Sequence, residues 1–365
     1  MASSIVKINV LTNNDCPNSR AFNCPLLSAK RHFSERKRKL HFIFGPPEKA
    51  LECDVLFINS KVFRYDWRKG KNKIIDFLES ARRKGVKTVW FDATDSTWCT
   101  QFEALEHVDL FLKSQILKDK TLYLKPFRTG RIFTDYFDEL YKCGEESVSY
   151  PVPREEDLKK LDVSWNSCFE NYNSSRYGFA AKMKQKLRPY LANLLGEKLS
   201  IAFTPAAKER TISVSCRVGL GHSRPSVIAH RKSVTEKMTS FGAESGKIPL
   251  DRYFEEMRNS KIAAGPFGVG EITLRDFEII ICGALLFKPE MDHMETWPDL
   301  FQPGKTFIQH KWDLSDLDEA FEEILKNDSM RIETASEAQK VYADAVSEEG
   351  MEKFAVRLIE KISRI

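Results

Sequence analysis

The stretch from Ser260 to Pro289 constrains the fold more than any other part of the chain. An apolar run at 260–264 leads into Gly-Pro-Phe-Gly-Val-Gly at 265–270, and a largely apolar segment and a second apolar run, 284–287, follow. This order predicts a strand, a glycine loop, a helix and a strand. Glycine allows close backbone approach, and the start of a helix offers unpaired N–H groups and a positive dipole end. We therefore expect this loop to bind a phosphate group.

The predicted helix carries three charged residues on an otherwise apolar surface. Glu271, Arg275 and Glu278 are spaced i, i+4 and i+7, so they share one stripe. Buried charges need partners. One interpretation is an internal Glu–Arg–Glu network. The other, favoured by the adjacent glycine loop, is a nucleotide-diphosphate site in which Glu278 accepts from ribose hydroxyls and Arg275 faces the phosphates.

These residues carry a family resemblance. The run from Gly268 to Gly283, with Arg-x-x-Glu at 275–278 and Lys288-Pro289 beyond it, resembles the donor-binding segment of GT-B glycosyltransferases. It is most similar to exostosin-like and bacterial family 1 sugar transferases, and stretches 292–300 and 112–119 resemble the bacterial branch. The resemblance implies a nucleotide-sugar donor, with the glutamate on the ribose and the arginine near the phosphates.

The same resemblance bears on mechanism. In the retaining enzymes an E-x7-E signature is expected, but Gly270 stands eight residues before Glu278 and Glu271 is one place off. We therefore expect an inverting enzyme. The loop after 284–287 touches the sugar in this family, which implies donor contacts for His293 and Glu295.

A second glycine-rich loop follows the predicted strand 212–218. The amides of Gly219 and Gly221, with Arg217 or Arg224, are expected to hold the donor's phosphates opposite Arg275. The complete set of expected donor-binding residues is Glu278, Arg275, Thr273, Gly268, Gly270, Arg217, Gly219, Gly221, Arg224, His293 and Glu295.

The amino-terminal half alternates apolar runs with helical segments, which favours a doubly wound α/β sheet. A length of 365 residues suits two domains. We predict the GT-B arrangement, in which two Rossmann-like domains face a cleft. The expected division is an acceptor domain at 1–150, a linker with connecting helices at 151–200, a nucleotide-sugar domain at 201–348 and a helix at the domain junction at 349–365.

Two carboxylates follow a predicted central strand at 87–92 and are flanked by aromatic residues. We predict that Asp95 is the general base of an inverting reaction and that Asp92 is the second choice. The alternative for Asp95 is a helix cap. The polar loop after the first strand predicts acceptor contacts from Asn14, Asp15, Ser19 and Arg20, although Asn and Asp also favour ordinary turns.

Composition limits the classes of protein to which the chain can belong. Apolar residues make up 42% and charged residues 30% of the chain, as in a soluble globular protein, and the eight cysteines are scattered like the reduced thiols of a cytoplasmic one. A net charge of +5 is too small to indicate nucleic-acid binding. The basic segment 30–39 is either a solvated face or a patch for peripheral contact with anionic lipid.

The function that we predict is transfer of a hexosyl or pentosyl group from a nucleotide-diphosphate sugar to a glycan or lipid-linked acceptor. No cofactor is expected. Because His293 and its neighbours lack the third ligand that a metal would need, and no DxD-type pair is suitably placed, no metal is expected either. Two alternatives stay open: a nucleotide-sugar epimerase or hydrolase on the same fold, and a non-catalytic module that binds nucleotide sugars.

Overall fold

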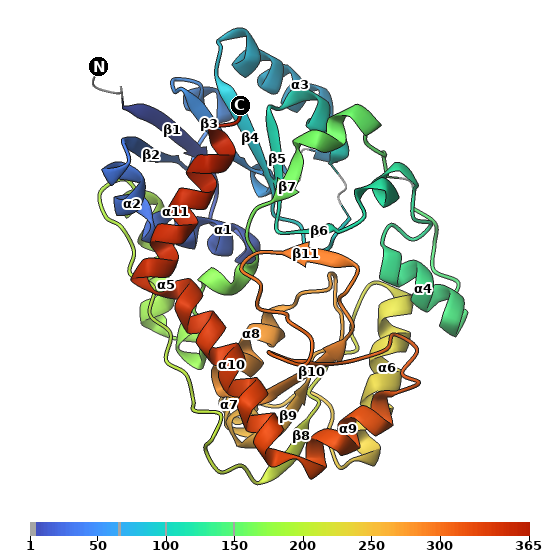
Figure 1. Cartoon of the computed structure of the whole chain (residues 1–365). Helices are drawn as coiled ribbons and strands as arrows, with labels where there is room; N and C mark the ends of the chain where they lie inside the picture. Colours follow the sequence, from blue (N-terminus) through green and yellow to red (C-terminus); the bar gives the residue numbers. More distant parts are fainter. Residues whose placement is uncertain (1–4, 65–66, 99–100, 149) are drawn as a thin grey trace.

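The structure, a computed structural model, describes residues 5–64, 67–98, 101–148 and 150–365 (Figure 1). Its amino-terminal sheet is entirely parallel, in the order β2-β1-β3-β4-β5-β7. The strands are β1 (Val6–Leu11), β2 (Arg38–Ile43), β3 (Val55–Asn59), β4 (Lys87–Asp92), β5 (Leu110–Lys113) and β7 (Leu161–Val163).

Helices cover both faces of this sheet because its strands are apolar on both sides. Phe57 and Phe91 point to one face, and their neighbours Ile58 and Trp90 point to the other. The first face is covered by α1 (Pro17–Ser28), α2 (Lys30–Glu35) and the last helix of the chain, α11 (Glu348–Ile362). The second is covered by α3 (Trp67–Arg83).

The carboxyl-terminal sheet is also parallel, in the order β12-β10-β9-β8. Its strands are β8 (Ile212–Ser215), β9 (Ser260–Ala264), β10 (Leu285–Pro289) and β12 (Ile308–His310). One face is covered by α7 (Leu250–Asn259), α8 (Leu274–Cys282) and α10 (Asp328–Val346), and the other by α6 (Pro225–Ser240) and α9 (Leu317–Lys326). The expected order of strand, glycine loop, helix and strand is thus found as β9, 265–273, α8 and β10.

Local chemistry explains the limits of α8. Thr273 and Asp276 form a capping box at its start. Gly283 ends it in the left-handed region, with φ of 73°, where a side chain would also overlap the main-chain carbonyl of Thr204. The helix is therefore fixed at both ends, and the glycine loop before it has a defined position.

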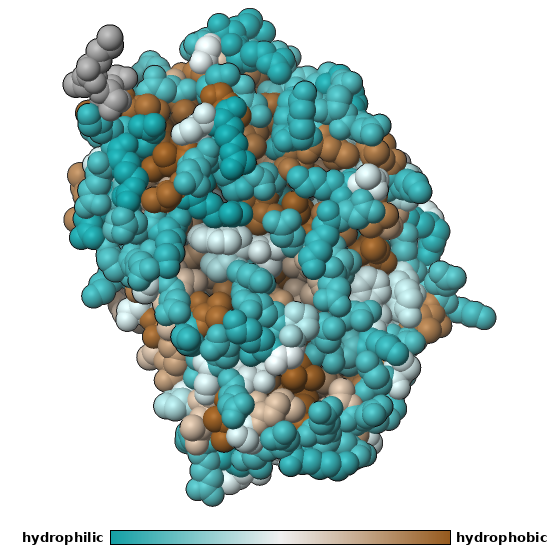
Figure 2. Space-filling view, viewed as in Figure 1, coloured by the Kyte–Doolittle hydropathy of each residue, from teal (hydrophilic) through white to brown (hydrophobic). Residues whose placement is uncertain are grey.

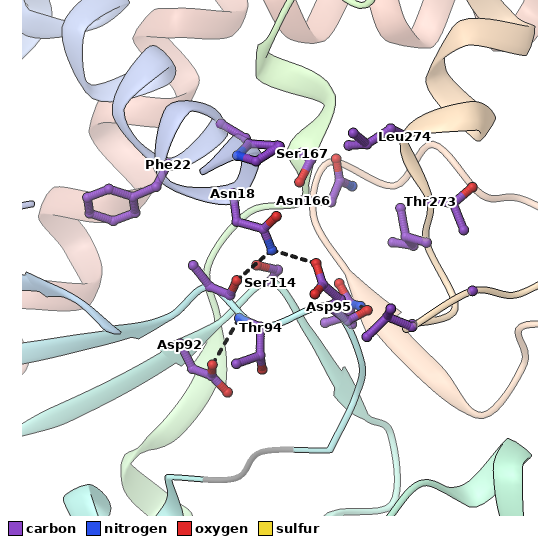
Figure 3. A pocket seen from close by; sticks show the side chains of 18 of the residues that line it. Asn18, Phe22, Asp92, Thr94, Asp95, Ser114, Asn166, Ser167, Thr273 and Leu274 are labelled. Carbon is purple, nitrogen blue, oxygen red and sulfur yellow. Dashed lines mark hydrogen bonds between the residues drawn. The ribbon is translucent and has the colours of Figure 1, made fainter. Parts of the chain in front are cut away.

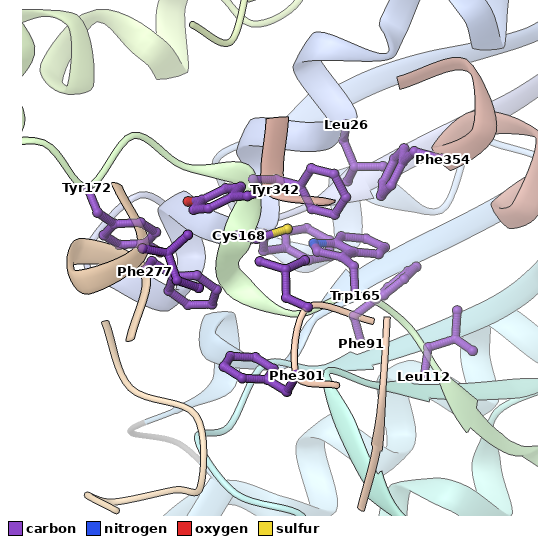
Figure 4. Close-up of a cluster of buried hydrophobic side chains, with 14 of the residues drawn as sticks. Leu26, Phe91, Leu112, Trp165, Cys168, Tyr172, Phe277, Phe301, Tyr342 and Phe354 are labelled. Atoms are coloured by element: carbon purple, nitrogen blue, oxygen red, sulfur yellow. The ribbon is translucent and has the colours of Figure 1, made fainter. Parts of the chain in front are cut away.

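Several contacts join the two halves. Strands β6 (Gln115–Leu117) and β11 (Met294–Thr296) pair antiparallel, so the stretches 112–119 and 292–300 lie side by side. Helix α4 (Ile132–Tyr141) packs on α6. Behind these contacts a single apolar core runs from Trp165 and Phe354 to Phe277 and Tyr342 (Figure 4).

Two parallel α/β units therefore face each other, which is the GT-B arrangement that the sequence predicts. The amino-terminal sheet extends past residue 150, because β7 pairs with β5. The segment expected to link the domains thus supplies a strand, and it also contains α5 (Phe179–Leu191). Short 3-10 helices lie at Pro47–Ala50, Ser60–Phe63, Phe102–His107, Lys120–Leu124, Glu155–Lys160, Ser167–Phe169 and Ser174–Tyr177.

The molecular surface in the view of Figure 2 is mainly polar, with apolar areas scattered among the polar side chains. Among the helices that the structure describes, none combines the length and the apolar character needed to cross a bilayer.

Candidate functional site

A cavity of about 280 Å³ lies between the two units (Figure 3). From the amino-terminal unit it is bounded by the start of α1 and by the segments that follow β4, β5 and β7. From the carboxyl-terminal unit it is bounded by the loop after β9, the start of α8 and residues in and just before α6. The lining includes Asn18, Phe22, Asp92, Thr94, Asp95, Ser114, Gln115, Trp165, Asn166, Ser167, His222, Arg231, Gly268, Gly270, Thr273 and Leu274.

Asp95 lies on the amino-terminal wall, just past the carboxyl end of β4. Asn18 Nδ2 donates to Asp95 Oδ1 at 2.5 Å and to the main-chain oxygen of Ala93 at 2.8 Å, so it ties α1 to this loop (Figure 3). Within the described part of the chain, no hydrogen bond is found to Asp95 Oδ2. The carboxylate is thus oriented by one neighbour and faces the cavity with its other oxygen open to a ligand.

Asp92 also borders the cavity, but its carboxylate has a different environment. It is fully buried with Lys113, whose Nζ lies 2.7 Å from Asp92 Oδ2 and 2.8 Å from Thr94 Oγ1. The amide of Thr94 donates to Asp92 Oδ1 at 3.0 Å. This buried ion pair fixes the start of the loop that carries Asp95, and it leaves both carboxylate oxygens of Asp92 engaged with neighbouring groups.

The opposite wall is the loop after β9, which is held from beneath by Lys288. The Lys288 ammonium is fully buried, donates to the main-chain oxygens of Gly265 (3.1 Å) and Glu271 (2.7 Å), and pairs with Asp276 at 3.1 Å. Burial lowers the pKa of Lys288 and raises that of Asp276, and their mutual attraction opposes both shifts. The loop is therefore braced at two carbonyls.

Gly270 is where this loop meets the other unit. A Cβ at this position would overlap the main-chain carbonyl of Asp95. The φ of Gly270 does not lie in the left-handed region, so backbone conformation does not require glycine here. Glycine is needed because the two backbones approach closely. The loop expected to bind donor phosphate is thus in direct contact with the loop that carries the predicted base.

Glu271 joins the two units. Its carboxylate is fully buried and accepts from Thr97 Oγ1 at 2.6 Å and from the Thr97 amide at 3.1 Å, and His293 Nε2 lies 3.5 Å away. Burial by itself raises the pKa of Glu271, but His293 and the Thr97 hydroxyl more than offset it, so the net shift is downward. Glu271 is therefore a contact between the units, not a member of a Glu–Arg–Glu network.

Arg275 lies at the carboxyl end of β9, and neither Arg275 nor Glu278 lines the cavity. Arg275 donates to the main-chain oxygens of Ala264 (2.9 Å) and Arg217 (3.2 Å), and its Nη2 is buried without a partner among the residues described. Glu278 accepts from the hydroxyl groups of Tyr253 (2.7 Å) and Tyr177 (3.4 Å). The arginine thus braces the two loops and retains one unused donor, whereas the glutamate is covered by tyrosines.

Arg231, a residue that no sequence motif indicates, brings positive charge to the cavity. Its Nε donates to Phe267 O and its Nη1 to Gly219 O, both at 2.8 Å, so it links both glycine loops. His222, also in the lining, has its pKa lowered by burial first and then by Arg231, Arg131 and Arg224. Arg131 Nε and Nη1 are buried without partners in the part of the chain that the structure describes. This side of the cavity is therefore electropositive.

The other expected donor residues take several positions. Arg217 pairs with Glu256 and Glu244, and it borders a second cavity of about 400 Å³ together with Gly219 and Tyr253. Gly221 is exposed.

Arg224 donates to Glu145 Oε1 and to the main-chain oxygen of Thr129, both at 2.6 Å, so it contacts the amino-terminal unit. His293 lies beside Glu271, outside the lining of the cavity, and Glu295 is exposed on β11.

None of the four expected acceptor residues lines the cavity. Asn14 Nδ2 donates to the main-chain oxygen of Gln185 at 2.6 Å, and Asp15 is exposed. Ser19 is fully buried and Arg20 Nε lies 3.9 Å from Glu170. The helix begins at Pro17, not after the polar loop, so Ser19 and Arg20 are helical. The residue of this stretch that reaches Asp95 is Asn18.

Among the described residues, no three His, Cys, Asp or Glu side chains are grouped so as to hold a metal ion.

Comparison with known proteins gives distant likenesses only. No protein-family model matches the chain, and no curated protein matches it. Anabaena HepE in complex with UDP is 11% identical, with 98% of this chain and 100% of that chain covered and a TM-score of 0.43. A glycosyltransferase from Rickettsia africae is 8% identical, with 99% of each chain covered and a TM-score of 0.44. The S. aureus MnaA–UDP structure is 8% identical, with 98% and 96% covered and a TM-score of 0.37. At these values the likeness extends to no residue of the site.

Proposed function

We propose that this protein is an inverting glycosyltransferase that uses a nucleotide-diphosphate sugar. One observation carries the proposal: a carboxylate on the amino-terminal unit, Asp95, and an arginine on the carboxyl-terminal unit, Arg231, line the same cavity beside a glycine loop. A general base and a cationic, amide-rich wall on opposite sides are what displacement of a nucleoside diphosphate by a hydroxyl group requires.

In this scheme the acceptor hydroxyl gives its proton to Asp95 as its oxygen attacks the anomeric carbon of the sugar. The bond from that carbon to the diphosphate breaks, and negative charge develops on the leaving group. Arg231 and the amides of Val269 and Gly270, all in the lining of the cavity, stabilise that charge. We further propose that the donor carries a hexosyl or pentosyl group, that the acceptor is a glycan or a lipid-linked molecule, and that the reaction needs no metal or cofactor. We also propose a cytoplasmic location, with membrane contact by segment 30–39.

Nucleotide binding is tested by thermal shift with UDP, GDP, CDP and their sugars. A ligand that binds only the folded state at about 100 times its Kd adds about 2.7 kcal/mol to the free energy of unfolding, so one nucleoside diphosphate should raise the Tm clearly. Arg231→Ala should abolish the shift. Lys232→Ala, an exposed change on the same helix, should leave it unchanged. A full shift in folded Arg231→Ala would contradict the assignment.

Catalysis is tested with Asp95→Asn. We expect donor binding to persist and transfer to fall by about 10²–10⁴-fold, the range for loss of a general base. Asp251→Asn, at an exposed position of α7 away from the cavity lining, is the control. Release of free sugar from the donor without an acceptor would instead support a hydrolase, and binding without any product would support a non-catalytic module.

A further inference from the structure

Helix α5 and the turn after it expose an unusual number of large apolar side chains. Phe179, Tyr190 and Leu194 are 80%, 77% and 76% exposed. At about 100° per residue, the large exposed apolar side chains of the helix from Phe179 to Leu191 fall within an arc of about 120°. We call this the α5 surface; it consists of Phe179, Met183, Leu187, Tyr190, Leu191, Leu194 and Leu195.

The opposite side of α5 is anchored to the amino-terminal unit by polar groups. These contacts fix which side of the helix faces outward. Arg188 is 5% exposed and forms a bidentate salt bridge with Glu197, in which Nε donates to Oε1 at 2.8 Å and Nη2 donates to Oε2 at 3.0 Å. The Asn14 amide holds the main-chain oxygen of Gln185 at 2.6 Å. Lys30 Nζ donates to the oxygens of Ala192 and Asn193 at 2.8 and 2.7 Å. Because the polar side of α5 faces the protein, its apolar side faces outward. An exposed apolar surface of this kind marks a site for binding a partner or a membrane.

Basic side chains flank the α5 surface. Helical spacing puts Lys184 on one side of the apolar arc and Lys182 and Lys186 on the other, and all three are exposed. Between 179 and 198 there are five basic residues and one acidic residue. Because Lys30 Nζ contacts the main-chain oxygens of Ala192 and Asn193, the basic segment 30–39 adjoins the same region. In Figure 1, α5 lies at the left edge, below α2.

We propose that the α5 surface binds the protein to an anionic lipid bilayer, with the apolar side chains inserted at the level of the headgroups and the lysines on their phosphates. A convex apolar ridge between lysines is the pattern of interfacial helices. A symmetric contact with a second copy would bring the same lysines of both chains together, and like charges oppose that. The proposal does not depend on the chemistry of the cavity.

The test is co-sedimentation of the full chain with vesicles of phosphatidylcholine, alone or with about a third phosphatidylglycerol. We expect binding to the anionic vesicles only, weakened by salt. Replacing Phe179, Tyr190 and Leu194 with Ser should reduce binding at least about tenfold. Lys182→Gln with Lys186→Gln should reduce it about 30-fold, since each surface lysine contributes about 1 kcal/mol. Hydrogen exchange of 179–195 should slow on vesicle addition.

Matched controls use equivalent groups elsewhere on the surface. Leu140→Ser with Leu325→Ser removes apolar side chains that are 41% and 39% exposed, and Lys326→Gln with Lys340→Gln removes exposed charges; neither pair should change binding. Equal binding of the α5 variants and the parent, or no binding of the folded parent to anionic vesicles, would overturn the proposal. So would a parent dimer that the serine variant dissociates without any effect on vesicles, because the surface would then join two copies.

Discussion

The contact between Thr97 and Glu271 predicts a measurable coupling between the two units. Thr97→Val keeps the shape of the side chain but removes the 2.6 Å hydrogen bond to a fully buried carboxylate. A hydrogen bond to a charged group contributes about 1.5–3 kcal/mol, so Thr97→Val should lower the free energy of unfolding by that amount. Glu271→Gln removes the charge from the same contact. In a double-mutant cycle the two changes should cost less together than the sum, by about 1–3 kcal/mol.

The assay is urea unfolding at pH 7, followed by tryptophan fluorescence. The matched control is Thr121→Val, which removes a 2.6 Å bond to Asp119 at an exposed position and should cost less than about 0.5 kcal/mol. Because the pKa of Glu271 is lowered by folding, its stabilising contribution is present above the unfolded pKa of about 4.3 and is lost as the pH falls through the folded value. Additivity within about 0.5 kcal/mol would refute the reasoning.

Three further predictions concern separate features. Gly270→Ala should force the two loops apart by ~2 Å to reach an ordinary contact distance, so the Tm and the turnover should both fall. Gly45→Ala, where a Cβ meets nothing within 4 Å, should leave both unchanged. An unchanged Tm in Gly270→Ala would disprove the close approach. Burial lowers the pKa of His310 to about 4, so the unfolded state binds more protons than the folded state between pH 6.5 and 4. The free energy of unfolding, measured with urea, should therefore fall by up to about 3 kcal/mol as the pH drops over that range. His310→Leu should flatten this slope, and an unaltered slope would exclude His310 as its cause. Burial raises the pKa of Cys24 to about 12, so a maleimide at pH 8 should modify Cys143 well before Cys24. Peptide mass spectrometry measures the order of modification. Early modification of Cys24 would contradict the burial of its side chain.

The features that the sequence predicts well are those encoded by neighbouring residues. The order β9, loop, α8 and β10 follows from two apolar runs, a glycine loop and the glycine at 283, all within 30 positions. Asp95 is likewise found at the end of a strand, in the cavity, because parallel strands bring their carboxyl ends to one edge.

The features that it misses depend on partners far along the chain. Glu271 meets Thr97, 174 positions away, and Asn18 meets Asp95, 77 positions away. Arg231 sits in a helix with no glycine or motif beside it, and only the meeting of two loops at its guanidinium gives it a place in the site. Glu278 fits a sequence pattern, but Tyr253 and Tyr177 reach its carboxylate from other elements.

The return of α11 to the amino-terminal sheet has a consequence for dissecting the protein into pieces. Phe354 of this helix packs on Trp165 and Phe33, so a fragment that stops before residue 201 lacks part of its own interior. The remaining fragment would carry α11 with its apolar face exposed to solvent. Neither half is expected to behave as an autonomous module, whereas the two fragments mixed together should complement each other, as pieces of one cooperative folding unit do.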